Sequence, residues 1–166
     1  MMRLTRLFTA LAASALLIGL AGCGSDSNSA TETPEIPTFS SPTLAGAEFT
    51  SAELADKTTV LWFWAPWCSV CFAEAPEISA AASELNGEAE IIGVGALGPV
   101  DDMNQFVADT ELGQLRHISD EKAAVWAKFG VAAQPAFAFI SADGSVQIVP
   151  GSLNAEQIVE KARAFS

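Results

Sequence analysis

Histidine and cysteine, which build many metal and haem sites, are scarce in this chain of 166 residues. It has one histidine, His117, and three cysteines: Cys23, Cys68 and Cys71. A structural zinc site takes four cysteine or histidine ligands, and no second cysteine pair is present to complete one. Covalent haem attachment needs a histidine directly after a Cys-x-x-Cys motif, where this sequence has Phe72. The scarcity excludes a zinc finger and a c-type haem.

Basic residues are also few. Eight lysines and arginines stand against 20 aspartates and glutamates, and the formal net charge is −12. Nucleic acids and bare anionic membranes attract proteins through lysine and arginine, so we expect neither as a partner. The acidic residues are scattered without a long run, which is typical of a solvated surface.

The main apolar run is too short to span a membrane. Residues 11–21 are almost unbroken Leu, Ile, Ala and Gly, whereas a spanning helix needs about 20 apolar residues. Because Arg3 and Arg6 precede this run and small residues follow it, the pattern predicts a secretory signal peptide over residues 1–22. Its removal leaves six basic and 20 acidic residues, a net charge of −14.

The end of this segment, Leu20-Ala21-Gly22-Cys23, resembles the lipobox of bacterial lipoproteins. The resemblance implies that Cys23 becomes the first mature residue and carries lipid, including acyl chains such as palmitate. Each buried methylene contributes about 0.8 kcal/mol, so several chains would hold the protein at the extracytoplasmic face of the cell membrane. A plain signal peptide with a coincidental cysteine is the alternative. Residues 23–38, rich in Ser, Thr, Glu and Pro, predict a disordered tether.

From residue 39 to residue 166, apolar runs alternate with helical patterns, which is typical of one α/β domain. The patterns predict strands at 39–44 and 47–49 around Gly46, and at 58–64, 90–95, 115–118, 136–140 and 146–149. They predict helices from Thr50 or Ser51 to 55, from 68 to 85, from Asp101 or Asp102 to 109, from Ser119 or Asp120 to 129, and over 155–165 after Ser152 or Asn154. The run TTVLWFW at 58–64 has no polar alternation, so we expect it at the centre of the sheet.

Cys68 and Cys71 stand where this central strand gives way to a helix. A cysteine in the first turn of a helix lies near free N–H groups and the positive end of the helix dipole, which favour the thiolate. Cys68 is therefore the predicted nucleophile with a lowered pKa, and Cys71, which starts deeper, is the predicted resolving thiol. Dithiol–disulfide exchange through this pair needs no metal, nucleotide or flavin. An inert structural disulfide is the weaker interpretation, because closing so short a loop removes little conformational entropy from the unfolded chain.

Residues 62–71, WFWAPWCSVC, resemble the WAxWCxxC signature of the thioredoxin superfamily. Pro76 is similar to a proline within the active-site helix of that fold, and Pro135 to one preceded by a cis peptide bond. A trans proline that opens an edge strand is the alternative for Pro135. The resemblance spans residues 39–166 and is closest to the actinobacterial DsbE-like and DsbF-like proteins, secreted or lipid-anchored members of the TlpA-like branch.

This resemblance implies a thioredoxin-like α/β fold, with a central mixed sheet flanked by helices and an N-terminal β-hairpin. It implies an extracytoplasmic thiol:disulfide oxidoreductase that oxidises thiols of exported proteins through a redox-active Cys68–Cys71 disulfide. A membrane protein resembling vitamin K epoxide reductase is the implied partner for reoxidation. Trp67 would shield the disulfide and contact substrate, and Gln134, before Pro135, would offer backbone groups to an extended substrate chain.

One position departs from thioredoxin. The buried aspartate six residues before the first cysteine corresponds here to Trp62, which cannot act as a base. Glu74, one helical turn after Cys71, either replaces that base in part or is a solvated helix residue. The missing aspartate favours an oxidant, while Ser69-Val70 matches neither the Gly-Pro of thioredoxin nor the Pro-His of DsbA, so the direction of electron flow stays open.

Other functions share some of these features. A reductant for cytochrome c maturation could use the same fold and the same two cysteines. A copper-handling lipoprotein could use Cys68 and Cys71 as soft ligands, although the sequence has no suitably placed histidine or methionine cluster. A peroxidase expects threonine three residues before the reactive cysteine, where this chain has Ala65. The remaining aromatic candidates are interpreted as structural: Trp62, Trp64, His117 and Trp126.

Overall fold

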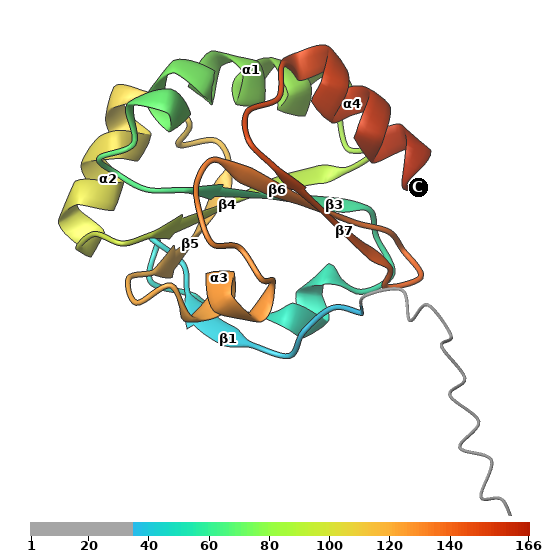
Figure 1. Cartoon of the computed structure of the whole chain (residues 1–166), viewed down its shortest axis with the longest axis horizontal. Coiled ribbons are helices and arrows are strands. Elements are labelled where there is room, and N and C mark those ends of the chain that lie inside the picture. The colour runs from blue at the N-terminus through green and yellow to red at the C-terminus, as the bar shows by residue number, and fades with distance from the viewer. Residues whose placement is uncertain (1–34) are drawn as a thin grey trace, which may run out of the picture. The chain divides into compact units, whose positions relative to one another are not determined.

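The computed structural model describes residues 35–166, which fold around a central five-stranded sheet (Figure 1). The strands of that sheet are β3 (Thr59–Trp64), β4 (Glu90–Ala96), β5 (Arg116–Asp120), β6 (Ala136–Ile140) and β7 (Val146–Pro150). The helices are α1 (Ser69–Leu85), α2 (Val100–Asp109), α3 (Ala124–Lys128) and α4 (Ala155–Ala164). A hairpin of β1 (Ser40–Pro42) and β2 (Glu48–Thr50), followed by the 3-10 helix η1 (Ser51–Leu54), precedes the sheet.

The sheet is mixed, with the order β5-β4-β3-β6-β7. Strand β3 pairs parallel with β4 and antiparallel with β6, so it lies at the centre, as its apolar run predicts. Helices α1, α2 and α4 cover one face of the sheet, whereas α3 and the hairpin cover the other (Figure 1). This arrangement confirms the expected thioredoxin-like α/β fold with an N-terminal hairpin.

The predicted signal peptide at 1–22, the lipidation site Cys23 and most of the predicted tether lie outside the described residues. Contact with the domain begins before residue 39, because Glu35 forms an antiparallel bridge with Ser145 and Ile36 packs against the core. Within residues 35–166, no helix combines the length and the apolar character needed to cross a membrane.

Alternate side chains of β3 enter two separate cores. Trp62 and Trp64 point toward α1, α2 and α4, and Leu61 and Phe63 point toward α3 and the hairpin. All four are fully buried. Because its side chains enter both cores, β3 joins the two layers. Each buried side chain of this size contributes about 1.5–3 kcal/mol to stability. The structural interpretation of Trp62, Trp64 and Trp126 is confirmed.

The boundary between β5 and α3 differs from the prediction. Ser119 or Asp120 was expected to open a helix, but both lie in β5, where they pair with Gly95 and Ala96 of β4. The Ser41 hydroxyl also donates to the Ser119 carbonyl. Helix α3 starts only after Ala123, which adopts a left-handed conformation with φ of 56°. Asp120 nevertheless caps the helix from a distance, as its carboxylate accepts the N–H groups of the first turn, Ala124, Val125 and Trp126.

Helix α2 begins earlier than predicted. Its N-cap is Pro99, with φ of −71°, and neither Asp101 nor Asp102 is the cap. Proline is pre-organised for the start of a helix because its ring fixes φ. The two aspartates lie in the first turn, where the positive end of the helix dipole stabilises carboxylates. Elsewhere the expected caps hold: Asn86 ends α1 in a left-handed conformation, and Asn154 begins α4.

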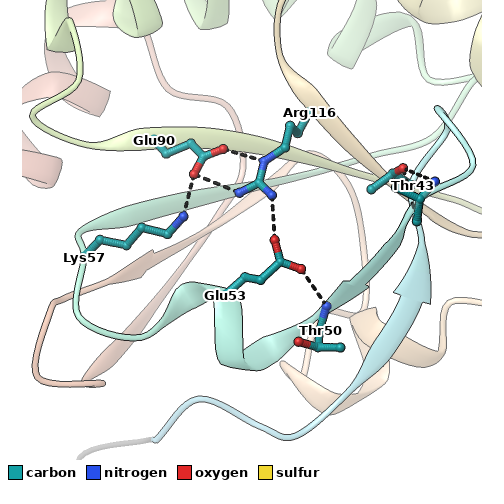
Figure 2. Close-up of polar contacts among 7 residues, drawn as sticks. Thr43, Thr50, Glu53, Lys57, Glu90 and Arg116 are labelled. Atoms are coloured by element: carbon teal, nitrogen blue, oxygen red, sulfur yellow. Dashed lines mark hydrogen bonds and ion pairs between the residues drawn. The ribbon is translucent and has the colours of Figure 1, made fainter.

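An ion-pair network joins the amino ends of the parallel strands on the hairpin side (Figure 2). Arg116 Nε and Nη2 donate to the two oxygens of Glu90 at 2.6 and 2.9 Å, and its Nη1 donates to Glu53 at 2.8 Å. Lys57 Nζ donates to Glu90 at 2.8 Å, and the Arg116 guanidinium lies 5.0 Å from the Phe49 ring centroid. Burial alone would raise the pKa of Glu90, but hydrogen bonds and charge from Arg116 and Lys57 outweigh it and lower the pKa.

His117 is a buried structural residue of β5, as interpreted from the sequence. Its Nε2–H donates to the Leu112 carbonyl at 3.0 Å, and its ring meets Trp64 edge to face. Burial lowers the pKa of His117, and the Leu112 hydrogen bond acts in the opposite direction. The imidazole and the Trp64 indole both lie over Gly93 of β4, where a side chain would overlap ring atoms of each.

We expect Gly93→Ala to destabilise the fold by about 1–3 kcal/mol, because the added methyl would overpack two buried rings. Gly113→Ala is the matched control, since a Cβ at Gly113 meets no atom within 4 Å and its effect should stay within about 0.5 kcal/mol. Urea unfolding monitored by fluorescence measures both. Equal stability of the two variants would show that the ring packing around Gly93 is looser than described.

Candidate active site

The two sulfurs of the Cys-x-x-Cys motif lie at the amino end of α1. Residues 65–67 lead from β3 to Cys68, which is the N-cap of the helix, and Cys71 lies in the first turn. The pair forms a disulfide with a Cα–Cα distance of 5.3 Å. Cys68 Sγ accepts the Cys71 backbone N–H at 3.0 Å, and the first turn of α1 contains no acidic side chain. Helix N–H groups therefore face the Cys68 sulfur without a competing negative charge.

The two cysteines differ in access. Cys68 keeps 6% of its surface exposed, whereas Cys71 is fully buried. Thiol–disulfide exchange requires an incoming sulfur to approach one sulfur of the bond. An external thiol can therefore reach Cys68 only, which is the asymmetry predicted for a nucleophile and a resolving thiol.

Trp67 is hydrogen-bonded to the loop that follows β4. Its indole N–H donates to the Leu97 carbonyl at 2.9 Å, while 62% of its surface stays exposed. Gly98 supports the same contact, because a Cβ there would overlap the ring of Pro66. Trp67 is thus a fixed, exposed aromatic surface beside Cys68, and its contact with substrate stays a prediction.

Large apolar side chains are exposed around the disulfide. Within residues 35–166, the exposed large hydrophobic residues are Trp67, Val70, Phe72 and Leu97. Three of them belong to the segment that carries the cysteines, and Leu97 touches Trp67 through its carbonyl. An exposed apolar patch of this kind marks an interaction surface, and here it borders the reachable sulfur. Val70 and the exposed Ser69 lie at this surface, between the two cysteines.

Gln134 and Pro135 lie at the same edge of the sheet as the disulfide. In the β3–β6 register, Phe63 faces Ala136, so the residues before β6 lie beside the end of β3. The Gln134–Pro135 peptide bond is cis, as the resemblance implied, and the Pro135 carbonyl accepts the Gly151 N–H at 2.9 Å. The structure therefore brings these two residues to the edge from which the cysteine loop also departs.

Glu74 is buried, with 5% of its surface exposed, so its interpretation as a solvated residue is wrong. One carboxylate oxygen accepts the indole N–H of Trp62 at 2.8 Å, and the other accepts the Leu153 N–H at 2.7 Å. Burial raises the pKa of the Glu74 carboxyl, although these N–H donors act in the opposite direction. Glu74 is therefore held beside Trp62, the residue at the position of thioredoxin's aspartate.

The raised pKa of Glu74 predicts a pH-dependent contribution to stability. A carboxyl whose pKa rises on folding stabilises the fold below its unfolded value of 4.5, and this contribution is lost as pH increases through the folded pKa. The unfolding free energy of wild type relative to Glu74→Gln should therefore be most favourable at low pH and should decrease as pH rises. Urea unfolding of both proteins between about pH 4 and pH 8 measures this difference. A difference that grows with pH would contradict the prediction.

Three residues that shape the site were missed from the sequence: Leu97, Gly98 and Phe106. A signal existed, because Leu97 and Gly98 directly follow a buried strand parallel to the one that leads to Cys68, and parallel strands end at the same edge. The only sequence signal for Phe106, which lies on α2 and is 4% exposed, was an apolar helical pattern. In the described part of the chain, no three histidine, cysteine or acidic side chains are grouped as metal ligands.

This fold is shared with known proteins. Residues 33–149 match the AhpC/TSA family. Over 111 residues the chain is 40% identical to the soluble secreted antigen MPT53 of Mycobacterium tuberculosis, covering 67% of this chain and 63% of that protein. The structure of DsbF from the same organism has 36% identity and a TM-score of 0.76, and the match covers 81% of this chain and 99% of that one.

A secreted M. tuberculosis disulfide oxidoreductase homologous to E. coli DsbE is also similar, at 34% identity and a TM-score of 0.70 over 76% of this chain and 95% of that one. The match to MPT53 spans less than two thirds of that protein, whereas the two solved structures are covered almost completely. The resemblance seen in residues 62–71 is confirmed. The chain belongs to the AhpC/TSA family, among its thioredoxin-like members that include the DsbE-like and DsbF-like proteins.

Proposed function

We propose that the protein is an extracytoplasmic thiol:disulfide oxidoreductase that oxidises thiols of exported proteins through Cys68 and Cys71. The observation that carries this proposal is the asymmetric disulfide at the amino end of α1, with Cys68 reachable and Cys71 buried. The family supports it, since a relative of similar fold is described as a secreted disulfide oxidoreductase.

The exchange has two steps. A substrate thiolate attacks Cys68 Sγ, the Cys68–Cys71 bond breaks, and a mixed disulfide forms while Cys71 leaves as a thiolate. A second substrate thiolate then attacks the substrate sulfur of that mixed disulfide and releases Cys68 as a thiolate. Two substrate thiols become one disulfide, and the enzyme pair gains two electrons and, after protonation, two protons. The disulfide is the only redox group that this scheme requires.

The protein environment favours the leaving thiolate at Cys68. Its sulfur accepts the Cys71 N–H, and the helix dipole adds positive potential at the same point. A stabilised Cys68 thiolate makes the reduced form more stable, and a more stable reduced form makes a stronger oxidant. The lack of a basic side chain at position 62, which is Trp62, also favours an oxidant, because reduction of a substrate needs the buried Cys71 to lose its proton.

A substrate chain would bind beside the disulfide in extended form. Gln134 is partly exposed, and neither its backbone N–H nor its carbonyl takes part in a hydrogen bond within residues 35–166. These groups would pair with the backbone of the substrate, and Trp67 and Val70 would cover its side chains. The geometry thus supports recognition of an unfolded segment around the reacting cysteine.

Reduction in cytochrome c maturation is the second candidate function, and Glu74 is the observation that favours it. A buried carboxyl with a raised pKa, one turn after Cys71, could accept the proton of that thiol as the missing aspartate would. The redox equilibrium of Cys68 and Cys71 with glutathione separates the two directions. A reduction potential near or below about −270 mV, that of thioredoxin, would rule out the oxidase.

The position of the protein in the cell is part of the same proposal. Lipid on Cys23 would hold the domain at the outer face of the cell membrane, and a vitamin K epoxide reductase-like protein would reoxidise it. The lipobox sequence supports the first point, and the secreted character of MPT53 supports export. Metabolic labelling with palmitate, compared between wild type and Cys23→Ala, tests the anchor.

Activity is tested with reduced, unfolded ribonuclease and with insulin. Wild type should accelerate disulfide formation in the first assay, and Cys68→Ala should reduce the rate to that of the uncatalysed reaction, because only Cys68 is reachable. A copper-binding lipoprotein would show no cysteine-dependent turnover in either assay. Turnover that survives in Cys68→Ala would contradict the proposal.

A further inference from the structure

A groove opens between the cysteine loop and helix α2. Its volume is about 380 Å³, and it is lined by Pro66, Trp67 and Phe72 from the cysteine segment and by Asp102, Gln105, Phe106 and Asp109 from α2. Trp67 immediately precedes Cys68, so one end of this α2 groove borders the reachable sulfur.

The apolar part of the α2 groove is firmly packed. Phe106 stacks on the buried Trp64 with a centroid distance of 4.3 Å, and Phe72 meets Phe106 edge to face at 6.0 Å. Trp67 is attached to the Leu97 carbonyl. Because Phe106 is nearly buried while Trp67 and Phe72 are exposed, the groove has an aromatic floor and two exposed aromatic walls. Such a groove accepts an apolar side chain with little rearrangement.

Two carboxylates lie on the side of the groove that α2 forms. Asp102 and Asp109 are exposed and lie two helical turns apart on α2, on the side that faces the groove. Gln105 donates one hydrogen bond to Asp109 Oδ1 at 2.7 Å. Of the ion pairs formed within residues 35–166, none includes Asp102 or Asp109. Their negative charge is therefore directed to solvent and to whatever enters the groove.

Basic residues lie elsewhere in the described part of the chain. Lys57 and Arg116 belong to the ion-pair network at the amino ends of the strands (Figure 2). Arg163, in the last turn of α4, pairs with Glu84 in the last turn of α1 and with Glu88 just after that helix. Lys161 lies in that same turn, and Lys122 and Lys128 accompany α3 on the other face of the sheet. The α2 groove is thus acidic without a neutralising partner in its lining.

We propose that the α2 groove selects substrates in which an apolar side chain and a lysine or arginine lie close to the reacting cysteine. The apolar side chain enters between Trp67 and Phe72, and the cation meets Asp102 and Asp109. This inference rests on the proposed function and names the class of exported polypeptide that it serves best. The charge complementarity of the groove is what identifies this occupant.

A second groove, on the other side of the first turn of α1, does not offer the same recognition. Its lining includes Val70, Glu74 and Glu77. The Glu74 oxygens accept N–H groups from Trp62 and Leu153, and Glu77 accepts the Ala155 N–H at 2.8 Å. These carboxylates accept hydrogen bonds within the fold, whereas the Asp102 side chain forms no hydrogen bond within residues 35–166 and remains available to a cation.

The test measures how fast reduced peptides with two cysteines reduce the Cys68–Cys71 disulfide of the full chain, followed by tryptophan fluorescence. Three peptides carry Leu-Lys, Leu-Glu or Ser-Lys beside the first cysteine. Each rate constant is divided by that of the same peptide with oxidised glutathione, because flanking charges also alter the reactivity of the peptide thiol. We expect the normalised rate for Leu-Lys to exceed that for Leu-Glu by about fivefold at low ionic strength, and to exceed that for Ser-Lys by a similar factor.

The Leu-Lys preference over Leu-Glu should fall below about twofold in the double variant Asp102→Asn/Asp109→Asn, and also in wild type at about 1 M salt. The control is Asp56→Asn/Glu160→Gln, which changes the net charge equally at exposed positions outside the groove lining and should keep the wild-type preference. Equal rates for Leu-Lys and Leu-Glu, or a preference that survives in the groove variant, would overturn the proposal. If all peptides react no faster than glutathione, the proposed function itself fails.

Discussion

Replacement of Cys71 by serine is expected to stop turnover and to trap a covalent complex between Cys68 and the substrate. The remaining Cys68 thiolate can still attack a disulfide of another protein, forming a mixed disulfide and expelling a substrate thiolate. Without Cys71 no internal thiol can resolve that bond. Non-reducing electrophoresis after incubation with an oxidised substrate protein should therefore show an adduct that dithiothreitol releases, with its cross-link at Cys68.

The matched control is Cys68→Ser, which keeps the buried Cys71 and should form no such adduct. The reason is access, since Cys71 is fully buried in the folded protein while Cys68 keeps 6% of its surface exposed. Turnover in both variants should fall to the uncatalysed rate. Adducts at Cys71 in Cys68→Ser, formed under conditions where the protein remains folded, would show that the assignment of nucleophile and resolving thiol is reversed.

Asp120→Ala is expected to cost about 3–5 kcal/mol of folding stability, the largest loss among the substitutions considered at structural positions. The carboxylate is 4% exposed and accepts the N–H groups of Ala124, Val125 and Trp126 at 2.7, 2.8 and 3.0 Å. Alanine would leave three donors at the start of α3 without their acceptor, and Trp126 belongs to the core on that face of the sheet. Calorimetry should show a Tm lower by about 10 °C.

Two further variants make this prediction specific to the capping bonds. Asp120→Asn keeps the size of the side chain and one acceptor oxygen, so its loss should lie between those of wild type and Asp120→Ala. Glu121→Ala removes an exposed neighbouring carboxylate and should change stability by less than about 0.5 kcal/mol. A loss in Asp120→Ala no larger than that in Glu121→Ala would show that the three hydrogen bonds contribute little.

Sequence-based predictions succeeded where one local pattern decides the structure. The run at 58–64 contains no polar alternation, and an unbroken apolar run of that length fits a strand buried on both faces. Helix α1 spans Ser69–Leu85 between caps at Cys68 and Asn86, in agreement with the helix predicted from its composition and the Asn-Gly pair. The position of the disulfide follows from these two elements, because Cys68 lies where they meet and Cys71 lies in the first turn of the helix.

Predictions failed where a partner from elsewhere in the chain decides the outcome. Of the two interpretations of Glu74, the solvated helix residue is wrong: the side chain is buried, and it accepts the N–H of Leu153, 79 residues away in sequence. Asp120 was one of two residues expected to open a helix, but it lies in β5 because it pairs with Ala96 of β4. Local periodicity contains no information about such contacts.

The amino-acid sequence by itself determined the chemistry of this protein: two cysteines at a strand–helix junction, where helix N–H groups stabilise a thiolate. Only the tertiary structure decided which surfaces surround that chemistry. The acidic α2 groove needs the hydrogen bond from Trp67 to Leu97 in the β4–α2 loop and the contact of Phe72 with Phe106. Each contact joins segments about 30 residues apart in sequence. The physical reason is that a backbone pattern follows from neighbouring residues, whereas recognition depends on which distant side chains the packing of the sheet brings together.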